Sequence, residues 1–232
     1  MLWGIAGAVE QEVRFIIENL SKDSVSQWGR KCVHTGKIKN QDAVVMATGI
    51  GKVKSAASIQ YMLDHFPVEA VIYLGMAGSV NPGIKVGDIV ISQKVVQHDF
   101  DLDGKKIVEE MKIPWLEANP ELIDLAVRAS QELGFKERVR IGTVLTGDQA
   151  IIDSKKRKWL WDAFHGDCVE MEGAAVASVC FQNSVPFVII RAITDLADEN
   201  TRNDFRRTMH KACVDAANIV LGMIGQSKCK RS

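Results

Sequence analysis

Residues 70–78 read AVIYLGMAG, an unbroken apolar run that ends in a glycine-rich turn. A short apolar run bounded by glycine is typical of a buried β-strand. Comparable runs occur at 2–8, 43–48, 88–96, 140–145 and 187–193. Helical patterns stand between them at 9–20, 52–65, 120–133 (with Asn119 as the expected cap), 173–182 and about 203–225. This alternation indicates a mostly parallel sheet with helices on both faces.

The composition is that of an ordinary globular protein. The 232 residues are 47% hydrophobic and 25% charged, with a formal net charge of zero, so nothing favours nucleic acid or a membrane as a partner. The five cysteines form no CxxC pair, which argues for reduced thiols in the cytoplasm rather than disulfides or zinc. The apolar start of the chain ends at Glu10, which argues against a signal peptide. We expect one domain over 1–226 and a basic tail over 227–232.

Polar groups follow the ends of the predicted strands, where open α/β sheets bind ligands. Carboxylates and glycines recur there, and Arg191 is the main cation among them. In chain order these groups are Glu10, Glu12, residues 49–52 (GIGK), residues 75–78 (GMAG), His98, Asp99, Asp101, Asp148, Glu170, Glu172, Arg191, Asp195 and Asp198. The pattern predicts a cleft lined by carboxylates.

Several of these residues also have a purely structural interpretation. Glu12 suits the first turn of a helix, where the helix dipole favours an acid. Residues 49–52 suit a plain strand-to-helix turn, and Asp195 suits a helix start. The stretch VEMEGAAVASVC, residues 169–180, is harder to explain structurally, because it sets two acids before an apolar helix. A buried carboxylate without a partner is costly, so a ligand is one candidate partner.

Seven stretches resemble, in order, the bacterial 5′-methylthioadenosine/S-adenosylhomocysteine nucleosidases of the purine nucleoside phosphorylase/nucleosidase superfamily. They are GIAGAVEQEV, GIGKVKSAAS, AGSVNPGIKVGDIVIS, TGDQAI, VEMEGAAVASVC, VPFVIIRAITDLAD and the later DF. The resemblance covers residues 2 to about 222. It implies a nucleoside phosphorylase-like fold, a single three-layer αβα domain with a central twisted mixed sheet. It also implies hydrolysis of the N-glycosidic bond of adenine thioether nucleosides, by a homodimer that uses no metal or cofactor.

The resemblance also implies roles for individual residues. Glu12 would activate the attacking water with help from Arg191, and Asp195 would protonate the leaving purine. The substrate-binding residues would be Glu172 and Met171 at the ribose, Ile151 at the base edge, Val9, Ile50 and Phe205 at the 5′ substituent, and Glu170, Met76, Ala77, Gly78 and Thr194 around them. Two-carboxylate chemistry of this kind agrees with general glycoside hydrolysis.

The chain departs from the family pattern at three places. Met76 stands where the family usually has serine, Ala150 where it usually has an aromatic residue against adenine, and residues 99–119 lack the usual aromatic residues. A related branch of the family hydrolyses aminofutalosine-type nucleosides, and a changed 5′ pocket would fit that substrate.

Two further functions compete with this interpretation. A nucleoside phosphorylase would need cationic donors for phosphate, whereas the strand ends here supply mainly acids. A non-catalytic nucleoside-binding protein would have no reason to keep Glu12, Glu172, Arg191 and Asp195 together. The apolar residues of 99–119, which are Ile107, Met111, Ile113, Trp115 and Leu116, predict an interface and hence a homodimer.

Overall fold

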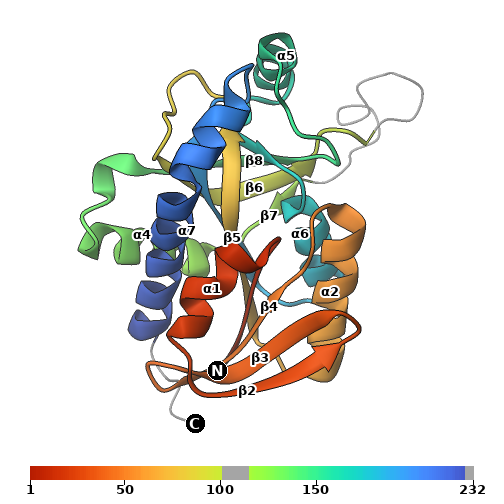
Figure 1. The fold of residues 1–232 in the computed structure, drawn as a ribbon, viewed down its shortest axis with the longest axis vertical. Coiled ribbons are helices and arrows are strands. Elements are labelled where there is room, and N and C mark those ends of the chain that lie inside the picture. The colour runs from red at the N-terminus through yellow and green to blue at the C-terminus, as the bar shows by residue number, and fades with distance from the viewer. Residues whose placement is uncertain (101–114, 228–232) are drawn as a thin grey trace.

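The computed structural model describes residues 1–100 and 115–227. Figure 1 shows strands at the centre and helices around them. The strands are β1 (Leu2–Gly7), β2 (Ser21–Trp28), β3 (Lys31–Ile38), β4 (Gln41–Ala47), β5 (Ala70–Ser79), β6 (Ile89–Gln97), β7 (Leu116–Glu117), β8 (Val139–Thr146), β9 (Cys168–Glu170) and β10 (Phe187–Asp195). The helices are α1 (Glu10–Glu18), α2 (Lys52–His65), α4 (Pro120–Glu132), the short 3-10 turn η1 (Lys136–Arg138), α5 (Ser154–Phe164), α6 (Gly173–Gln182) and α7 (Thr201–Gln226).

The described strands form one mixed sheet. In its first half, β1 lies between β4 and β5 and pairs with both in parallel, and β3 and β2 extend the edge beyond β4 in antiparallel order. In the second half, β10 lies between β5 and β6, and β6 continues through β8 and β9 back to β5. This part of the sheet therefore closes on itself. The mixed sheet is confirmed, although "mostly parallel" understates its antiparallel pairs.

Helices cover both faces of the sheet, which confirms the three-layer arrangement. Helices α1, α4 and α7 pack together on one side, and α2 packs against α6 on the other (Figure 1). Strands β5 and β10 are buried along almost their whole length, because helices lie on both of their faces. The Asn119 side chain caps α4 as predicted, accepting from the backbone N–H of Leu122 at 3.1 Å.

Three predicted features fall partly or wholly outside the described residues. Most of the 99–119 segment lies there, as do Cys229 and the basic tail from residue 228. Among the described cysteines, Cys168, Cys180 and Cys213 are buried thiols and Cys32 is an exposed one. None of the described helices is both long and apolar enough to cross a membrane.

Candidate active site

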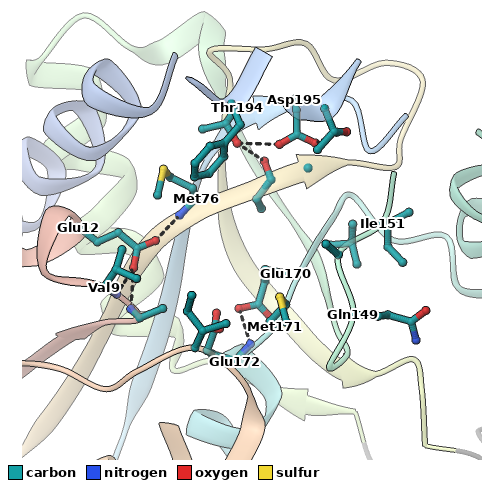
Figure 2. Close-up of a pocket in the computed structure, with 18 residues that line it drawn as sticks. Val9, Glu12, Met76, Gln149, Ile151, Glu170, Met171, Glu172, Thr194 and Asp195 are labelled. Atoms are coloured by element: carbon teal, nitrogen blue, oxygen red, sulfur yellow. Dashed lines mark hydrogen bonds between the residues drawn. The ribbon is translucent and has the colours of Figure 1, made fainter. Parts of the chain in front are cut away.

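A cavity of about 270 Å³ opens at the carboxyl ends of β1, β5 and β10, beside the start of α6 (Figure 2). Its wall combines carboxylates with apolar side chains and contains no lysine, arginine or histidine among the described residues. The lining residues are Ala8, Val9, Glu12, Ile50, Met76, Ala77, Gly78, Gln149, Ala150, Ile151, Val169, Glu170, Met171, Glu172, Thr194, Asp195, Thr201 and Phe205. Every predicted site residue except Arg191 is therefore brought together at one cavity.

Glu12 sits in the first turn of α1 with its side chain turned back toward the strand ends. One carboxylate oxygen accepts from the backbone N–H groups of Ala8 at 2.6 Å and Val9 at 3.0 Å, and the other accepts from that of Met76 at 3.0 Å. These bonds fix the carboxylate between β1 and β5. Burial raises the pKa of Glu12, although Arg191 and the backbone N–H groups oppose the rise.

Arg191 lies beneath the cavity floor and has no exposed surface. Its guanidinium donates to Glu170, lies 3.8 Å from a carboxylate oxygen of Glu172, and stacks 4.8 Å from the centre of the Tyr73 ring. Arg191 is thus the main cation at these strand ends, but its side chain does not line the cavity. The side chain acts on the site from below, as the counter-charge of the acids around it.

Glu170 also faces inward. Its carboxylate accepts from the backbone N–H of Glu172 at 3.1 Å and from that of Gly173 at 2.7 Å, and it pairs with Thr146 and Arg191. It therefore joins the start of α6 to β8 and β10. Although it contributes to the cavity wall, these bonds leave its oxygens occupied, so the contacts favour a supporting role for Glu170.

Glu172 turns in the opposite direction, toward the turn before α2. One of its oxygens accepts from the backbone N–H of Gly51 at 2.9 Å. Gly51 has a φ of 96°, a conformation that glycine adopts without strain. Burial, the charge of Glu170 and the charge of Glu12 raise the pKa of Glu172 to about 7, against the opposing effects of Arg191 and Gly51.

Asp195 stands at the end of β10 and is held from three directions. Thr194 donates to one oxygen at 2.8 Å, while the Ala197 backbone N–H and the Thr201 hydroxyl reach the other at 2.9 and 3.1 Å. Figure 2 shows this carboxylate on the opposite side of the cavity from Glu12. The two acids therefore face different parts of any ligand between them.

The other lining residues lie at the two ends of the cavity. Ile151 and Gln149 lie at one end, and Val9 lies at the other, beside Glu12 (Figure 2). Ala150 is exposed at the cavity wall. Ile50 is 52% exposed, so the rim near it presents bare apolar surface.

Some polar residues at the strand ends are used elsewhere. Asp99 accepts from Lys52 Nζ at 2.7 Å and from the backbone N–H of Asp148 at 2.8 Å. Asp148 in turn accepts from the backbone N–H of Lys52 at 2.8 Å. These bonds anchor the loop before Ile151 to the start of α2. His98 is buried outside the cavity, and burial lowers its pKa to about 4.

Sequence reasoning missed the bonds that position the acids. Thr201 stands six residues after Asp195, and its place at the start of a helix could have marked it as a partner. The donation from Gly51 to Glu172 joins residues 121 positions apart, and no local pattern indicates it. Within residues 1–100 and 115–227, no cluster of three or more histidine, cysteine or acidic side chains is arranged to hold a metal ion.

Comparison with known proteins gives consistent matches along the chain. Residues 3–225 match the sequence pattern of the Phosphorylase superfamily. A 5′-methylthioadenosine/S-adenosylhomocysteine nucleosidase of Colwellia psychrerythraea is 34% identical, over 98% of this chain and 97% of its own. An aminodeoxyfutalosine nucleosidase of Campylobacter jejuni is 32% identical, over 94% of this chain and 96% of its own. The solved 5′-methylthioadenosine/S-adenosylhomocysteine nucleosidase of Neisseria meningitidis, in complex with methylthio-immucillin-A, is 30% identical with a TM-score of 0.92, covering 97% of this chain and 99% of its own.

Proposed function

This chain belongs to the Phosphorylase superfamily and, within it, to the 5′-methylthioadenosine/S-adenosylhomocysteine nucleosidases, and we propose that it hydrolyses the N-glycosidic bond of adenine thioether nucleosides. One observation carries the proposal. Three carboxylates, those of Glu12, Glu172 and Asp195, meet at one small cavity and are each at least 95% buried. Hydrolysis of a glycosidic bond needs such acids at different sides of the sugar.

Asp195 is the proposed acid for the leaving base. As the bond between sugar and purine breaks, negative charge develops on the base, and a proton donated to it stabilises the transition state. The bonds from Thr194, Ala197 and Thr201 hold the carboxyl group in one orientation. Ile151, buried at the same end of the cavity, is the proposed contact for the base.

Glu12 is the proposed base for the attacking water. Its three backbone donors fix both oxygens, so a water bound there would meet a carboxylate that does not need to move. Burial raises the pKa of Glu12, which makes the carboxylate a stronger proton acceptor. A base whose pKa lies nearer the working pH is the more effective one.

Glu172 and Met171 are the proposed ribose contacts. A carboxylate can accept from two hydroxyl groups at once, and Glu172 has one oxygen without a described hydrogen-bond donor. Positive charge builds on the sugar in the transition state. A buried anion near the sugar therefore stabilises that state more than the ground state.

A phosphorylase activity fits this cavity poorly. Phosphate needs several cationic or backbone donors, and the described wall offers no basic side chain. Arg191, the nearest cation, already pairs with Glu170 beneath the floor. The test is adenine release with and without phosphate. Equal rates and an unphosphorylated ribose derivative that keeps its 5′ thioether support hydrolysis, whereas a sugar phosphate product would contradict it.

A second candidate is hydrolysis of an aminodeoxyfutalosine-type nucleoside. Ile50, a proposed contact of the 5′ substituent, is 52% exposed at the cavity rim, and an open rim at that end suits a bulkier 5′ substituent. A panel of methylthioadenosine, adenosylhomocysteine, aminodeoxyfutalosine and inosine, compared by kcat/KM for base release, decides between the two. A complete lack of turnover on all four would favour a non-catalytic nucleoside-binding protein.

We also propose that the enzyme is a homodimer. The apolar rim at Ile50 continues to Val53, which lies in the first turn of α2 and is 80% exposed, and Phe181 on the neighbouring α6 is 63% exposed. A second subunit on this side would cover the rim of the cavity and remove that apolar surface from water. The cytoplasmic location expected from the sequence stays a prediction.

A further inference from the structure

Three charged residues beside the proposed active site form a closed cycle of hydrogen bonds. Lys52 Nζ donates to one carboxylate oxygen of Asp99 at 2.7 Å, and the backbone N–H of Asp148 donates to the other oxygen at 2.8 Å. The backbone N–H of Lys52 donates to the Asp148 side chain at 2.8 Å, which completes the cycle. The three residues come after β4, β6 and β8, so the cycle joins three separate strand ends.

The ion pair in this cycle is more enclosed than an ordinary surface pair. The side chains of Lys52 and Asp99 are 18% and 15% exposed, against 37% and 59% in the pair between Lys37 and Asp42. Burial acts to raise the pKa of Asp99, but the bonds from Lys52 and Asp148 hold that pKa below its usual value. Exposed ion pairs contribute little to stability, whereas a carboxylate that is largely buried and bonded at both oxygens has a fixed position.

One bond of the cycle holds the loop after β8. Residues 149–151 of this loop line the cavity at the end proposed for the base. Residues 148–150 are exposed, so packing does little to fix them and hydrogen bonds do more. The N–H of Asp148 is bonded to Asp99 immediately before this stretch. The position of the proposed base contact, Ile151, therefore depends on Asp99.

The other bond holds the turn before α2. Lys52 directly follows Gly51, whose N–H donates to Glu172 at 2.9 Å. Gly51 has no side chain that could pack and fix its direction, and its φ of 96° lies in a region that glycine enters freely. Lys52 is bonded through both its ammonium group and its backbone N–H. The direction of the donor to Glu172 therefore depends on the same cycle.

We propose that Asp99 is a positioning residue that couples the two halves of the active site. It sets the base contact through Asp148, and it sets the ribose carboxylate Glu172 through Lys52 and Gly51. This inference rests on the proposed function and adds a residue that does not line the cavity. Because each partner uses a different oxygen of Asp99, a single substitution there should disturb both halves at once.

The first test measures adenine binding by calorimetry and kcat/KM for methylthioadenosine. A small displacement of groups far from the chemistry can cost about 10²-fold, so Asp99→Ala should weaken both quantities by between about tenfold and 10²-fold. Lys52→Met leaves the bond between Asp99 and Asp148 in place. It should lower kcat/KM but change adenine affinity by no more than about twofold. Lys52→Arg keeps the positive charge and should recover most of kcat/KM. Asp42→Ala breaks the exposed pair with Lys37 and is the matched control, with neither quantity changed.

The second test is the pH dependence of kcat/KM. The Gly51 N–H is one of the groups that oppose the rise in the pKa of Glu172 to about 7. Loosening the turn weakens this donor, so the pKa of Glu172 should rise further in Asp99→Ala and in Lys52→Met. The sugar needs Glu172 as an anion, and activity therefore falls as pH falls through this pKa. The acid limb of the profile should move to higher pH in both variants. The other charged groups that act on Glu172 stay unchanged, and these are Glu12, Glu170 and Arg191.

A purely structural role for the cycle gives a different pattern, which would overturn the inference. Asp99→Ala would then lower the melting temperature but leave adenine affinity, kcat/KM and the acid limb as in the wild type. An equal loss of adenine affinity in Asp99→Ala and Lys52→Met would also contradict the division between the two oxygens. If Asp99→Ala does not fold, Asp99→Asn, which keeps one acceptor oxygen, takes its place in every comparison.

Failure of the proposed function gives a separate result. If the wild-type enzyme releases no adenine from any nucleoside, that function is wrong, and adenine binding alone decides the inference. Weaker binding by Asp99→Ala, with Lys52→Met and Asp42→Ala like the wild type, supports it. Equal affinity in all four proteins, or no binding by any of them, overturns it.

Discussion

Arg191 and Glu170 form an ion pair that is closed off from solvent beneath the cavity where Glu12, Glu172 and Asp195 meet. The same carboxylate receives the first backbone N–H groups of α6. One residue therefore holds both the counter-charge of the site and the helix start that carries Glu172.

Glu170→Gln should destabilise the fold strongly. The amide keeps an oxygen for the α6 backbone but removes the anion closest to the buried Arg191, which is left with only Glu172 at 3.8 Å as an ion-pair partner among the described residues. Breaking a buried pair from one side typically removes about 3–5 kcal/mol from the free energy of unfolding. Urea denaturation measures the loss. Asp162→Asn, which breaks the exposed pair between Lys158 and Asp162, is the control, and its change should stay below about 1 kcal/mol.

Gly75→Ala should lower activity by displacing side chains of the candidate site. Gly75 is paired with Arg191 across β5 and β10, and a methyl group there would overlap both the Arg191 guanidinium and the Glu12 carboxylate. A displacement of about 1 Å at a reacting group can lower the rate about 10²-fold. Steady-state kcat reports the effect. Gly83→Ala, whose methyl would meet only the Asn81 side chain at 3.3 Å, should retain near wild-type turnover.

The raised pKa of Glu172 makes stability depend on pH. Its pKa rises from 4.5 to about 7 on folding, so the folded state binds more protons between these values and stability falls as pH rises through this window. Glu172→Gln lacks this titration. Relative to the wild type, the variant should therefore gain on the order of 1–3 kcal/mol in free energy of unfolding between pH 5 and pH 8. Parallel urea curves of both proteins at the two pH values measure the difference, and identical pH dependence would argue against the raised pKa.

Asp195→Asn should separate chemistry from binding. The amide keeps the size of the side chain but cannot donate the proton that the leaving base needs. General acid catalysis typically contributes about 10²–10⁴-fold, so kcat should fall by that amount. Binding of a non-hydrolysable nucleoside, measured by calorimetry, should change little. Near-normal turnover at saturating substrate would contradict the assignment of Asp195 as the acid.

The proposed dimer can be tested at its apolar surface. The wild-type chain should scatter light as twice its 25.6 kDa mass. Val53→Glu should shift the mass toward the monomer and lower activity, because it places a charge on surface that we expect to be buried. Lys54→Glu changes the charge of the next residue and serves as the comparison. A wild-type monomer at micromolar concentration would contradict the proposal.

The strands that carry the site were predictable because their residues are almost all apolar. The runs at 70–78 and 187–193 lie in β5 and β10, the most fully buried long strands, where burial on both faces leaves a continuous apolar signal. Residues 21–28 lie at the sheet edge as β2 and are almost wholly exposed. Because neither face of β2 is buried, its sequence shows no alternation of apolar and polar residues that would predict a strand. Helix α5 was missed for the same reason, since Leu160 is its only fully buried residue.

The candidate site was predictable in its residues but less so in their directions. Glu12, Glu172 and Asp195 stand at strand ends, and the sheet brings such ends together. Nothing in VEMEG says that Glu170 faces the core while Glu172 faces the cavity. That division follows from the short strand β9, which pairs with β5 and β8, and from the capping of α6 by Glu170. Both are tertiary features that sequence spacing does not encode.

The position of β10 has a consequence for how the chain matures on the ribosome. This strand enters the sheet between β5 and β6, two strands made about 90 or more residues earlier. A nascent chain that has emerged only as far as α6 therefore lacks one of the two connections between the halves of the sheet, the other being β9, and it lacks Arg191 and Asp195. Until β10 is made, the edges of β5 and β6 that it will pair with have unpaired backbone N–H and C=O groups, and such edges can pair with strands of other chains. The sheet therefore closes, and Arg191 and Asp195 join the candidate site, only after residue 195 has been made.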